Sequence, residues 1–282
     1  MTSVLSTAIE ERIPTTGGLH IFIRSWVPAV PARAVVAICH GVKSHSGYYL
    51  WAASQLAARG FAVYALDLRG RGQSDGDRFY VDTVQEYVDD VDALMKTARA
   101  RHPEQPVFLL GHSAGGVVSS VYTLEHQQEL AGFICESFAF RVYAPDFALA
   151  VLKGLSHLAP HAHVLFLKNA DFSRDPAAVK AMDDDPLIAH EAQPTRTVAA
   201  LVRADERLER EFPLITLPVF ILHGTADKVT RPEGSQLFFD TAGSSDKTLK
   251  LYNDHAHDLL NDVGREGVMA DIVGWIESRL PS

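Results

Sequence analysis

A serine framed by two glycines is the strongest chemical signal in the chain, at residues 111–115, which read Gly-His-Ser-Ala-Gly. Apolar residues 107–110 precede it and a run of small residues follows, so the motif lies between a predicted strand and a predicted helix. Gly111 and Gly115 lack a Cβ and let strand and helix approach closely, while the strained turn exposes the hydroxyl of Ser113. Free N–H groups at the helix start face whatever reacts there. The pattern predicts a nucleophilic serine.

Such a serine needs a base to take its proton and a buried acid to orient that base. With this motif, the acid and the histidine are expected in the order Ser, Asp, His, each after a strand. Asp227 directly follows the predicted strand 217–222. Both His255 and His257 follow the predicted strand 248–252, and their spacing alone does not separate them. The sequence therefore predicts Ser113, Asp227 and one of two histidines as the reacting groups.

Acyl transfer at a serine also requires N–H donors for the developing oxyanion. One donor is expected to be the backbone N–H of Ala114, directly after the serine, and the other that of Val42, in the loop after the predicted strand 34–39. Each such donor typically contributes about 3 kcal/mol of transition-state stabilisation.

Other histidines give no convincing metal site. Residues 255–258 read His-Ala-His-Asp and begin like a metal-binding H-x-H-x-D-H run, but positions 259 and 260 are both leucine. His157, His161 and His163 have no carboxylate or cysteine at zinc spacing, so we expect them to be solvated. We expect neither a metal nor a cofactor.

Composition restricts the class of protein. The 282 residues are 47% hydrophobic and 22% charged, which is typical of a protein with a large core, and the net charge of −9 argues against a nucleic-acid partner. Cys39 and Cys135 lie in strand-like runs and are expected to be buried free thiols. Residues 1–14 show no signal-peptide pattern, and the apolar stretch 147–167 is too interrupted to cross a membrane. We therefore expect a cytoplasmic location.

Strand and helix patterns alternate over most of the chain. A hairpin is predicted at 7–14 and 19–27, followed by buried strands at 34–39, 61–66, 106–112 and 130–137, with helices at 50–59, 84–98 and 117–126 between them. The alternation resumes at 217–222 with a helix at 232–241, a strand at 248–252 and a final helix from 259 to 280. This pattern predicts an α/β fold with a mostly parallel twisted sheet and helices on both faces.

Between these halves the alternation stops. Helical patterns at 146–158, 175–182 and 196–210 are separated by prolines. We interpret 138–212 as a mainly helical cap inserted over the strand ends, between core segments 1–137 and 213–282. Two ordinary crossover helices with loops are the alternative.

Nearly the whole chain resembles the α/β-hydrolases related to monoacylglycerol lipases and lysophospholipases, the serine aminopeptidase-like group. The shared motifs are H-G at 40–41, H-S-G at 45–47 with Tyr49, D-x-R-G-x-G-x-S at 67–74, G-H-S-A-G-G at 111–116, S-R-D-P at 173–176, D-P-L at 185–187, H-G-x-x-D-x-V at 223–229, and His257 with Asn261-Asp262 after it. The resemblance implies the α/β-hydrolase fold, nucleophile Ser113, acid Asp227, base His257 rather than His255, and oxyanion donors Val42 and Ala114.

The loop after residue 41 departs from the family pattern. Ser44 stands where the family usually has Glu, and Gly47-Tyr48-Tyr49 contains no Arg. We therefore expect an ion pair near the mouth of the site to be missing. The cap after residue 187 also follows the pattern only loosely.

Three functions fit these residues. The first is a serine hydrolase that cleaves monoacylglycerol-like or other apolar-acyl esters; apolar stretches at 138–140 and 147–155 suggest an apolar substrate, although they could simply be cap core. The second is a thioesterase or acyltransferase using the same three residues. The third is a non-catalytic binding protein on a hydrolase scaffold, which usually lacks one of the three.

Overall fold

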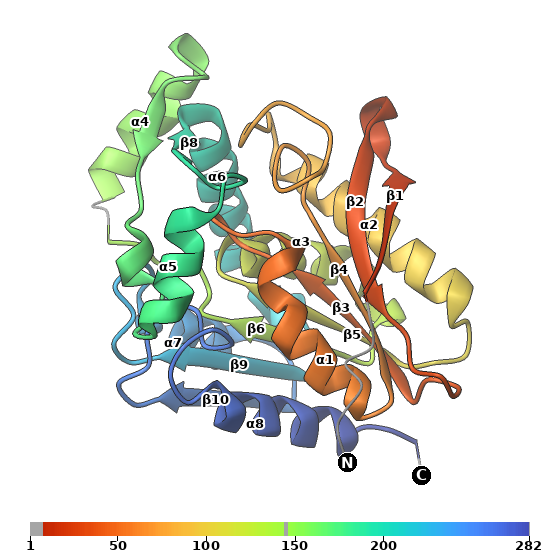
Figure 1. The fold of residues 1–282 in the computed structure, drawn as a ribbon. Helices are drawn as coiled ribbons and strands as arrows, with labels where there is room; N and C mark the ends of the chain where they lie inside the picture. Colours follow the sequence, from red (N-terminus) through yellow and green to blue (C-terminus); the bar gives the residue numbers. More distant parts are fainter. Residues whose placement is uncertain (1–7, 144–145, 282) are drawn as a thin grey trace.

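A computed structural model describes residues 8–143 and 146–281. Its centre is an eight-stranded sheet in the order β1-β2-β4-β3-β5-β6-β9-β10 (Figure 1). The strands are β1 Ile9–Pro14, β2 His20–Trp26, β3 Ala34–Cys39, β4 Phe61–Leu66, β5 Val107–His112, β6 Gly132–Glu136, β9 Val219–Gly224 and β10 Lys247–Tyr252. β1 and β2 form the predicted antiparallel hairpin, β2 pairs antiparallel with β4, and all remaining pairs are parallel. The predicted mostly parallel sheet is confirmed; the expectations for residues 1–7 lie outside the described part.

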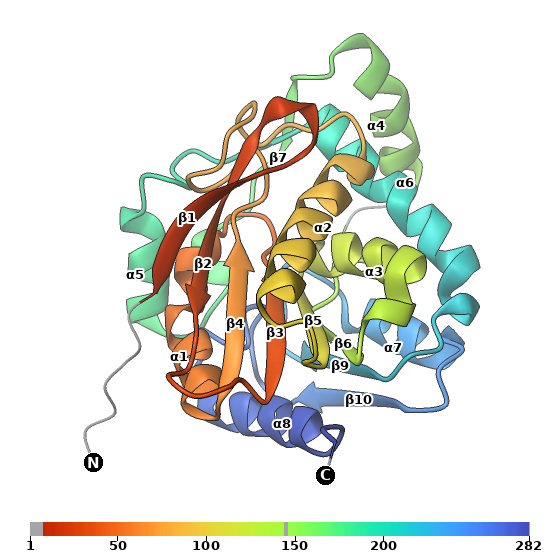
Figure 2. The same cartoon turned by 90° about the vertical axis from the view of Figure 1, so that its right-hand side faces the viewer.

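Helices cover both faces of this sheet, as predicted (Figure 2). The helices of the sheet layer are α1 Leu50–Ala58, α2 Val84–Arg101, α3 Ala114–His126, α7 Pro232–Thr241 and α8 Arg265–Glu277. Side chains of β3 alternate between two cores: Val35 and Ala37 pack with α2, α3 and α7, whereas Val36 and Ile38 pack with α1 and α8. The central strands are continuously apolar because neither face meets water.

Parallel pairing brings the carboxyl ends of the strands to one edge. Cys39 lies opposite Gly111, His112 opposite Glu136, and Gly224 opposite Tyr252. The loops that follow β3, β5, β9 and β10 therefore meet at this edge, where ligands bind in open α/β sheets.

The segment between β6 and β9 contains α4 Asp146–Leu158, α5 Pro176–Asp184 and α6 Thr195–Glu211, close to the predicted helices. The structure adds a short antiparallel pair, β7 His163–Leu165 with β8 Gln193–Pro194, that the sequence did not predict. Strands of two or three residues are too short to show an alternating pattern.

The last helix begins later than predicted, at Arg265 instead of 259. Gly264 precedes it with a φ of 93°, a left-handed conformation that interrupts the helix. The Asp262 carboxylate accepts the N–H of Ala256 and of Arg174, which holds residues 256–262 as a loop.

Both cysteines lie in strands of the sheet. Cys39 and Cys135 are free and buried, as predicted, on the strands either side of β5.

Among the described helices, none is both long and apolar enough to span a membrane.

Apolar residues of the segment between β6 and β9 divide into two groups. Phe138 and Phe140 are buried and pack against Phe212, so they belong to the core. Phe147 and Val151 on α4 are exposed. Phe138 and Phe140 therefore give no evidence for an apolar substrate pocket.

Candidate active site

The turn around Ser113 is strained, as its sequence predicts. Ser113 has φ 56° and ψ −122°, and α3 begins at the next residue. A Cβ on Gly115 would lie 2.3 Å from the carbonyl oxygen of His40, and one on Gly111 would lie 2.6 Å from Ser119 Oγ. Both glycines are therefore required by close approach between strand, helix and the loop after β3.

Asp227 lies in the loop after β9 and is almost fully buried. One carboxylate oxygen accepts the N–H groups of Val229 (2.7 Å) and Thr230 (2.9 Å). The other is 2.7 Å from Nδ1 of His257 and 3.0 Å from Nε2 of His223. Burial alone would raise the pKa of Asp227, but the two histidines hold it well below its usual value. The carboxylate is therefore ionised.

His257, and not His255, meets this acid. With Nδ1 bound to Asp227, the free ring nitrogen of His257 is Nε2, which is buried and has no hydrogen-bond partner in the described part of the chain. Nδ1 of His255 instead lies 3.1 Å from the carbonyl oxygen of Asn253 in the same loop. Phe172 packs edge-on against the His257 ring, with centroids 5.1 Å apart. The structure joins acid and histidine, but it forms no hydrogen bond between His257 Nε2 and Ser113.

His223 is a site residue whose role the sequence analysis missed. Its Nδ1 lies 2.7 Å from Ser235 Oγ, and its Nε2 lies beside the Asp227 carboxylate. If the Ser235 hydroxyl donates to Nδ1, Nε2 carries the proton and donates to Asp227. The H-G-x-x-D spacing, four residues from His223 to Asp227, was the available signal.

The loop after β3 lies against Ser113. A Cβ on Gly41 would lie 2.7 Å from the Cβ of Ser113, so this position also requires glycine. A cavity of about 10 Å³ is lined by both Val42 and Ala114. In the part of the chain that the structure describes, neither of their amides donates to a protein acceptor. Both predicted oxyanion donors thus border one small space.

His40 fixes this loop. Its Nε2 accepts the N–H of Leu68 (3.0 Å), which assigns the ring proton to Nδ1, 2.6 Å from the carbonyl oxygen of Gly41. Burial lowers the pKa of His40 to about 4, so the ring is neutral and keeps this arrangement at neutral pH.

A carboxylate from the segment between β6 and β9 also holds the loop. Glu191 Oε1 accepts the N–H of Lys43 (2.9 Å) and pairs with Arg71 Nη1 (2.5 Å). Arg71 also donates to Gln193 Oε1 (2.7 Å), and the side chains of Arg71 and Glu191 are almost fully buried. The departure at Ser44 predicted that an ion pair near the mouth of the site would be missing. The structure has a different, buried ion pair, Arg71–Glu191, whose carboxylate holds the same loop by accepting the N–H of Lys43.

Among the described residues, one buried group of three side chains could hold a metal ion: His112, Glu136 and Asp258, whose ligand atoms lie within 4.8 Å of one another. Burial raises the pKa of Glu136 well above its usual value and that of Asp258 to about 6. Carboxyl groups bind cations in their ionised form, which burial disfavours here. Glu136 is therefore favoured as a neutral acid, whereas Asp258 is protonated only below about pH 6.

Asp258→Asn is expected to stabilise the protein at pH 8 by about 2 to 3 kcal/mol and to leave its stability unchanged at pH 4. The folded-state pKa of Asp258, about 6, exceeds the unfolded value near ~4. The native protein therefore binds the extra proton between these values and loses stability as pH rises through them. Urea unfolding at both pH values measures the effect.

The matched control is Asp254→Asn, which changes an exposed carboxylate of the same loop. It should show no such difference between pH 4 and pH 8. An equal change for Asp258→Asn at the two pH values would contradict the raised pKa of Asp258.

Comparison with known proteins gives consistent matches over most of the chain. The family model described as serine aminopeptidase, S33, matches residues 30–264. The chain is 33% identical over 279 residues to the monoacylglycerol lipase of Mycolicibacterium smegmatis, covering 98% of this chain and 100% of that protein. It is 31% identical over 267 residues to the human monoglyceride lipase, covering 93% and 88%. The crystal structure of Paleococcus ferrophilus monoacylglycerol lipase matches with a TM-score of 0.83 at 30% identity, covering 92% of this chain and 99% of that chain.

Proposed function

Because the chain belongs to the α/β-hydrolase family described as serine aminopeptidase, S33, and is a hydrolase of the lipase and esterase type, we propose that it cleaves carboxylic esters through an acyl-enzyme on Ser113. The proposed substrates are monoacylglycerol-like or other apolar-acyl esters. Lipase names among the similar proteins support this class, since an ester or lipid substrate is what they share.

In the proposed first half-reaction, His257 Nε2 takes the proton of the Ser113 hydroxyl as its oxygen attacks the ester carbonyl. The negative charge moves to the carbonyl oxygen, where the N–H groups of Val42 and Ala114 stabilise it. The tetrahedral intermediate then expels the alcohol, which leaves with the proton from His257, and the acyl group remains on Ser113.

In the second half-reaction, water replaces the alcohol. His257 takes a proton from the water as the water oxygen attacks the acyl carbonyl, and the carboxylic acid leaves as the proton returns to Ser113. Asp227 remains ionised throughout, holds the His257 ring by Nδ1 and stabilises the imidazolium form.

The observation that carries this proposal is the arrangement of His257. Its Nδ1 is 2.7 Å from the ionised Asp227, and its Nε2 is buried without a protein partner in the described residues. Hydrogen bonds between a nucleophile and its base are often long before substrate binds. We infer that Ser113 and His257 Nε2 meet when an ester occupies the site.

We also propose that residues 138–212 act as a cap over this site, with 1–137 and 213–282 as the core. Several contacts between 138–212 and the loops around the site support this position: Glu191 binds Lys43 and Arg71, His45 lies 2.8 Å from Asp185, and the N–H of Asp258 donates to the carbonyl oxygen of Phe172 (2.8 Å).

Labelling with a fluorophosphonate tests the reaction class. The unaltered protein should be labelled at Ser113 and Ser113→Ala should not. Ser119→Ala, which removes a buried hydroxyl from α3, should be labelled normally. Failure of the unaltered protein to react would favour a binding protein on this scaffold and overturn the proposal.

The substrate class is tested separately with p-nitrophenyl esters of increasing acyl length. We expect kcat/KM to rise from acetate toward medium-length chains, because each buried methylene adds binding energy. A strict preference for acetate would exclude an apolar acyl pocket while leaving the serine mechanism intact.

A further inference from the structure

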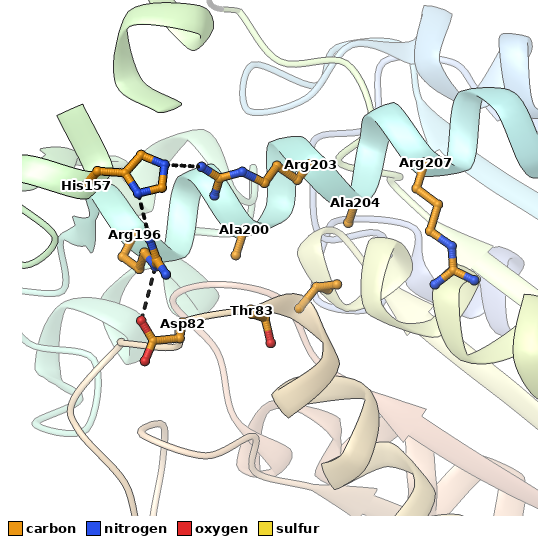
Figure 3. Close-up of a pocket in the computed structure, with 9 residues that line it drawn as sticks. Asp82, Thr83, His157, Arg196, Ala200, Arg203, Ala204 and Arg207 are labelled. Atoms are coloured by element: carbon orange, nitrogen blue, oxygen red, sulfur yellow. Dashed lines mark hydrogen bonds and ion pairs between the residues drawn. The ribbon is translucent and has the colours of Figure 1, made fainter. Parts of the chain in front are cut away.

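A second cavity, of about 400 Å³, lies between the start of α2 and helices α4 and α6 (Figure 3). Three arginines line it from one face of α6: Arg196, Arg203 and Arg207. Ala200 and Ala204 lie on the same face, because steps of three and four residues return to one side of a helix. The wall of the cavity that α6 provides is therefore apolar at the two alanines and cationic at the three arginines.

This cavity is separate from the proposed catalytic centre. Leu201, the residue after Ala200, lines the small cavity that also borders Val42 and Ala114. The two spaces thus lie on neighbouring faces of α6.

The three arginines differ in how their charge is balanced. Arg196 pairs with Asp82 (3.1 Å), and Arg207 pairs with Glu125 (2.7 Å) and with Glu211. Arg203 forms no ion pair with a carboxylate among the described residues; its contact is with Nε2 of His157 (3.3 Å). Among the arginines that line the cavity, Arg203 is thus the one without a carboxylate partner in the described part of the chain.

His157 cannot accept hydrogen bonds from both Arg196 and Arg203. Its Nδ1 lies 3.4 Å from Arg196 Nη1 while its Nε2 faces Arg203, and Figure 3 shows both guanidinium groups directed at the ring. A neutral imidazole has one acceptor nitrogen, and a protonated one has none. At least one of the two contacts therefore brings two N–H groups together, so His157 does not serve as the acceptor for both arginines.

An anion in the cavity would offer acceptor oxygens to both guanidinium groups. A guanidinium fork matches the paired oxygens of a carboxylate or phosphate. The first turn of α2 adds a favourable field, although its capping carboxylate, Glu86, already accepts the N–H groups of Asp82 and Thr83. The arginines, and not the helix start, would thus hold the ligand.

We propose that this cavity binds an amphiphilic anion, with its carboxylate or phosphate head between Arg203 and Arg196 and a short apolar tail against Ala200 and Ala204. The site does not depend on the reaction proposed for Ser113. It can therefore be tested on protein that cannot turn over an ester.

The experiment is calorimetric titration of Ser113→Ala protein with hexanoate, hexyl phosphate, inorganic phosphate and the neutral hexanol. At least one of the two amphiphilic anions should bind, and Arg203→Gln should weaken it at least tenfold. Arg279→Gln, a change in an arginine paired with Asp246, should leave the affinity unchanged. The tighter of the two anions identifies the head group.

Protection from phenylglyoxal gives a second measurement without a change in the cavity. The amphiphilic anion should slow modification of Arg203, detected by mass spectrometry, whereas hexanol should not. Equal affinity in Arg203→Gln and its parent, or hexanol binding as tightly as the anions, would overturn the proposal. So would inorganic phosphate binding as tightly as hexyl phosphate, or no binding of either amphiphilic anion.

Discussion

Ser113→Ala is expected to lower kcat for a carboxylic ester by about 10⁶-fold, and His257→Ala by a similar factor. The two groups act in one proton transfer, so loss of either removes the same step, and the double variant should be no slower than the single ones. Asp227→Asn should cost about 10⁴-fold, because it leaves the ring of His257 without its ionised partner. Steady-state rates with a p-nitrophenyl ester measure all four variants.

His255→Ala is the matched control for this series. His255 stands two residues from His257 in the same loop, yet the described structure gives it no contact with Asp227. Its replacement should change kcat by no more than a few-fold. A loss at His255 comparable to that at His257, or additive losses in the Ser113 and His257 double variant, would contradict the assignment.

Glu191→Ala is expected to destabilise the protein by about 3 to 5 kcal/mol, because it leaves the guanidinium of Arg71 buried without its carboxylate. It should also lower kcat/KM, since the N–H of Lys43 loses its acceptor next to the proposed donor Val42. Loss of one oxyanion donor costs about 10²- to 10³-fold, which sets the upper limit. Urea unfolding and ester hydrolysis measure the two effects.

A double variant separates these two roles. Arg71→Met with Glu191→Leu removes both buried charges and should recover much of the stability. It should not recover the rate, because leucine cannot accept the Lys43 N–H. Recovery of both would show that Glu191 acts on the fold alone. Glu209→Ala, which breaks the solvent-exposed pair with Arg141, is the control and should cost less than about 1 kcal/mol.

Features that depend on neighbours in sequence were predictable. Gly111, Ser113 and Gly115 lie within five residues, and their types determine the close approach and the positive φ that the structure displays. The continuous apolar strands predicted a sheet covered on both faces, which the two cores confirm. Chain order at the strand ends was enough to predict that Asp227 and one of two histidines would lie together.

Features that depend on distant contacts were not predictable. Glu191 reaches Lys43 across 148 residues, and no local pattern distinguishes it from a solvent-exposed glutamate. The late start of α8 depends on contacts of Asp262 with Ala256 and Arg174, so the helical pattern alone placed it too early. Spacing could not choose between His255 and His257, whereas the bond to Asp227 distinguishes them.

The two buried thiols have a practical consequence. Cys39 and Cys135 flank the central strand β5, and burial raises the pKa of Cys39 to about 12 and that of Cys135 well above its usual value. The thiolate is the form that reacts with alkylating reagents, so both sulfurs should stay inert until the middle of the sheet separates. The rate at which iodoacetamide modifies the two thiols therefore measures global opening of the native protein, with no engineered probe required.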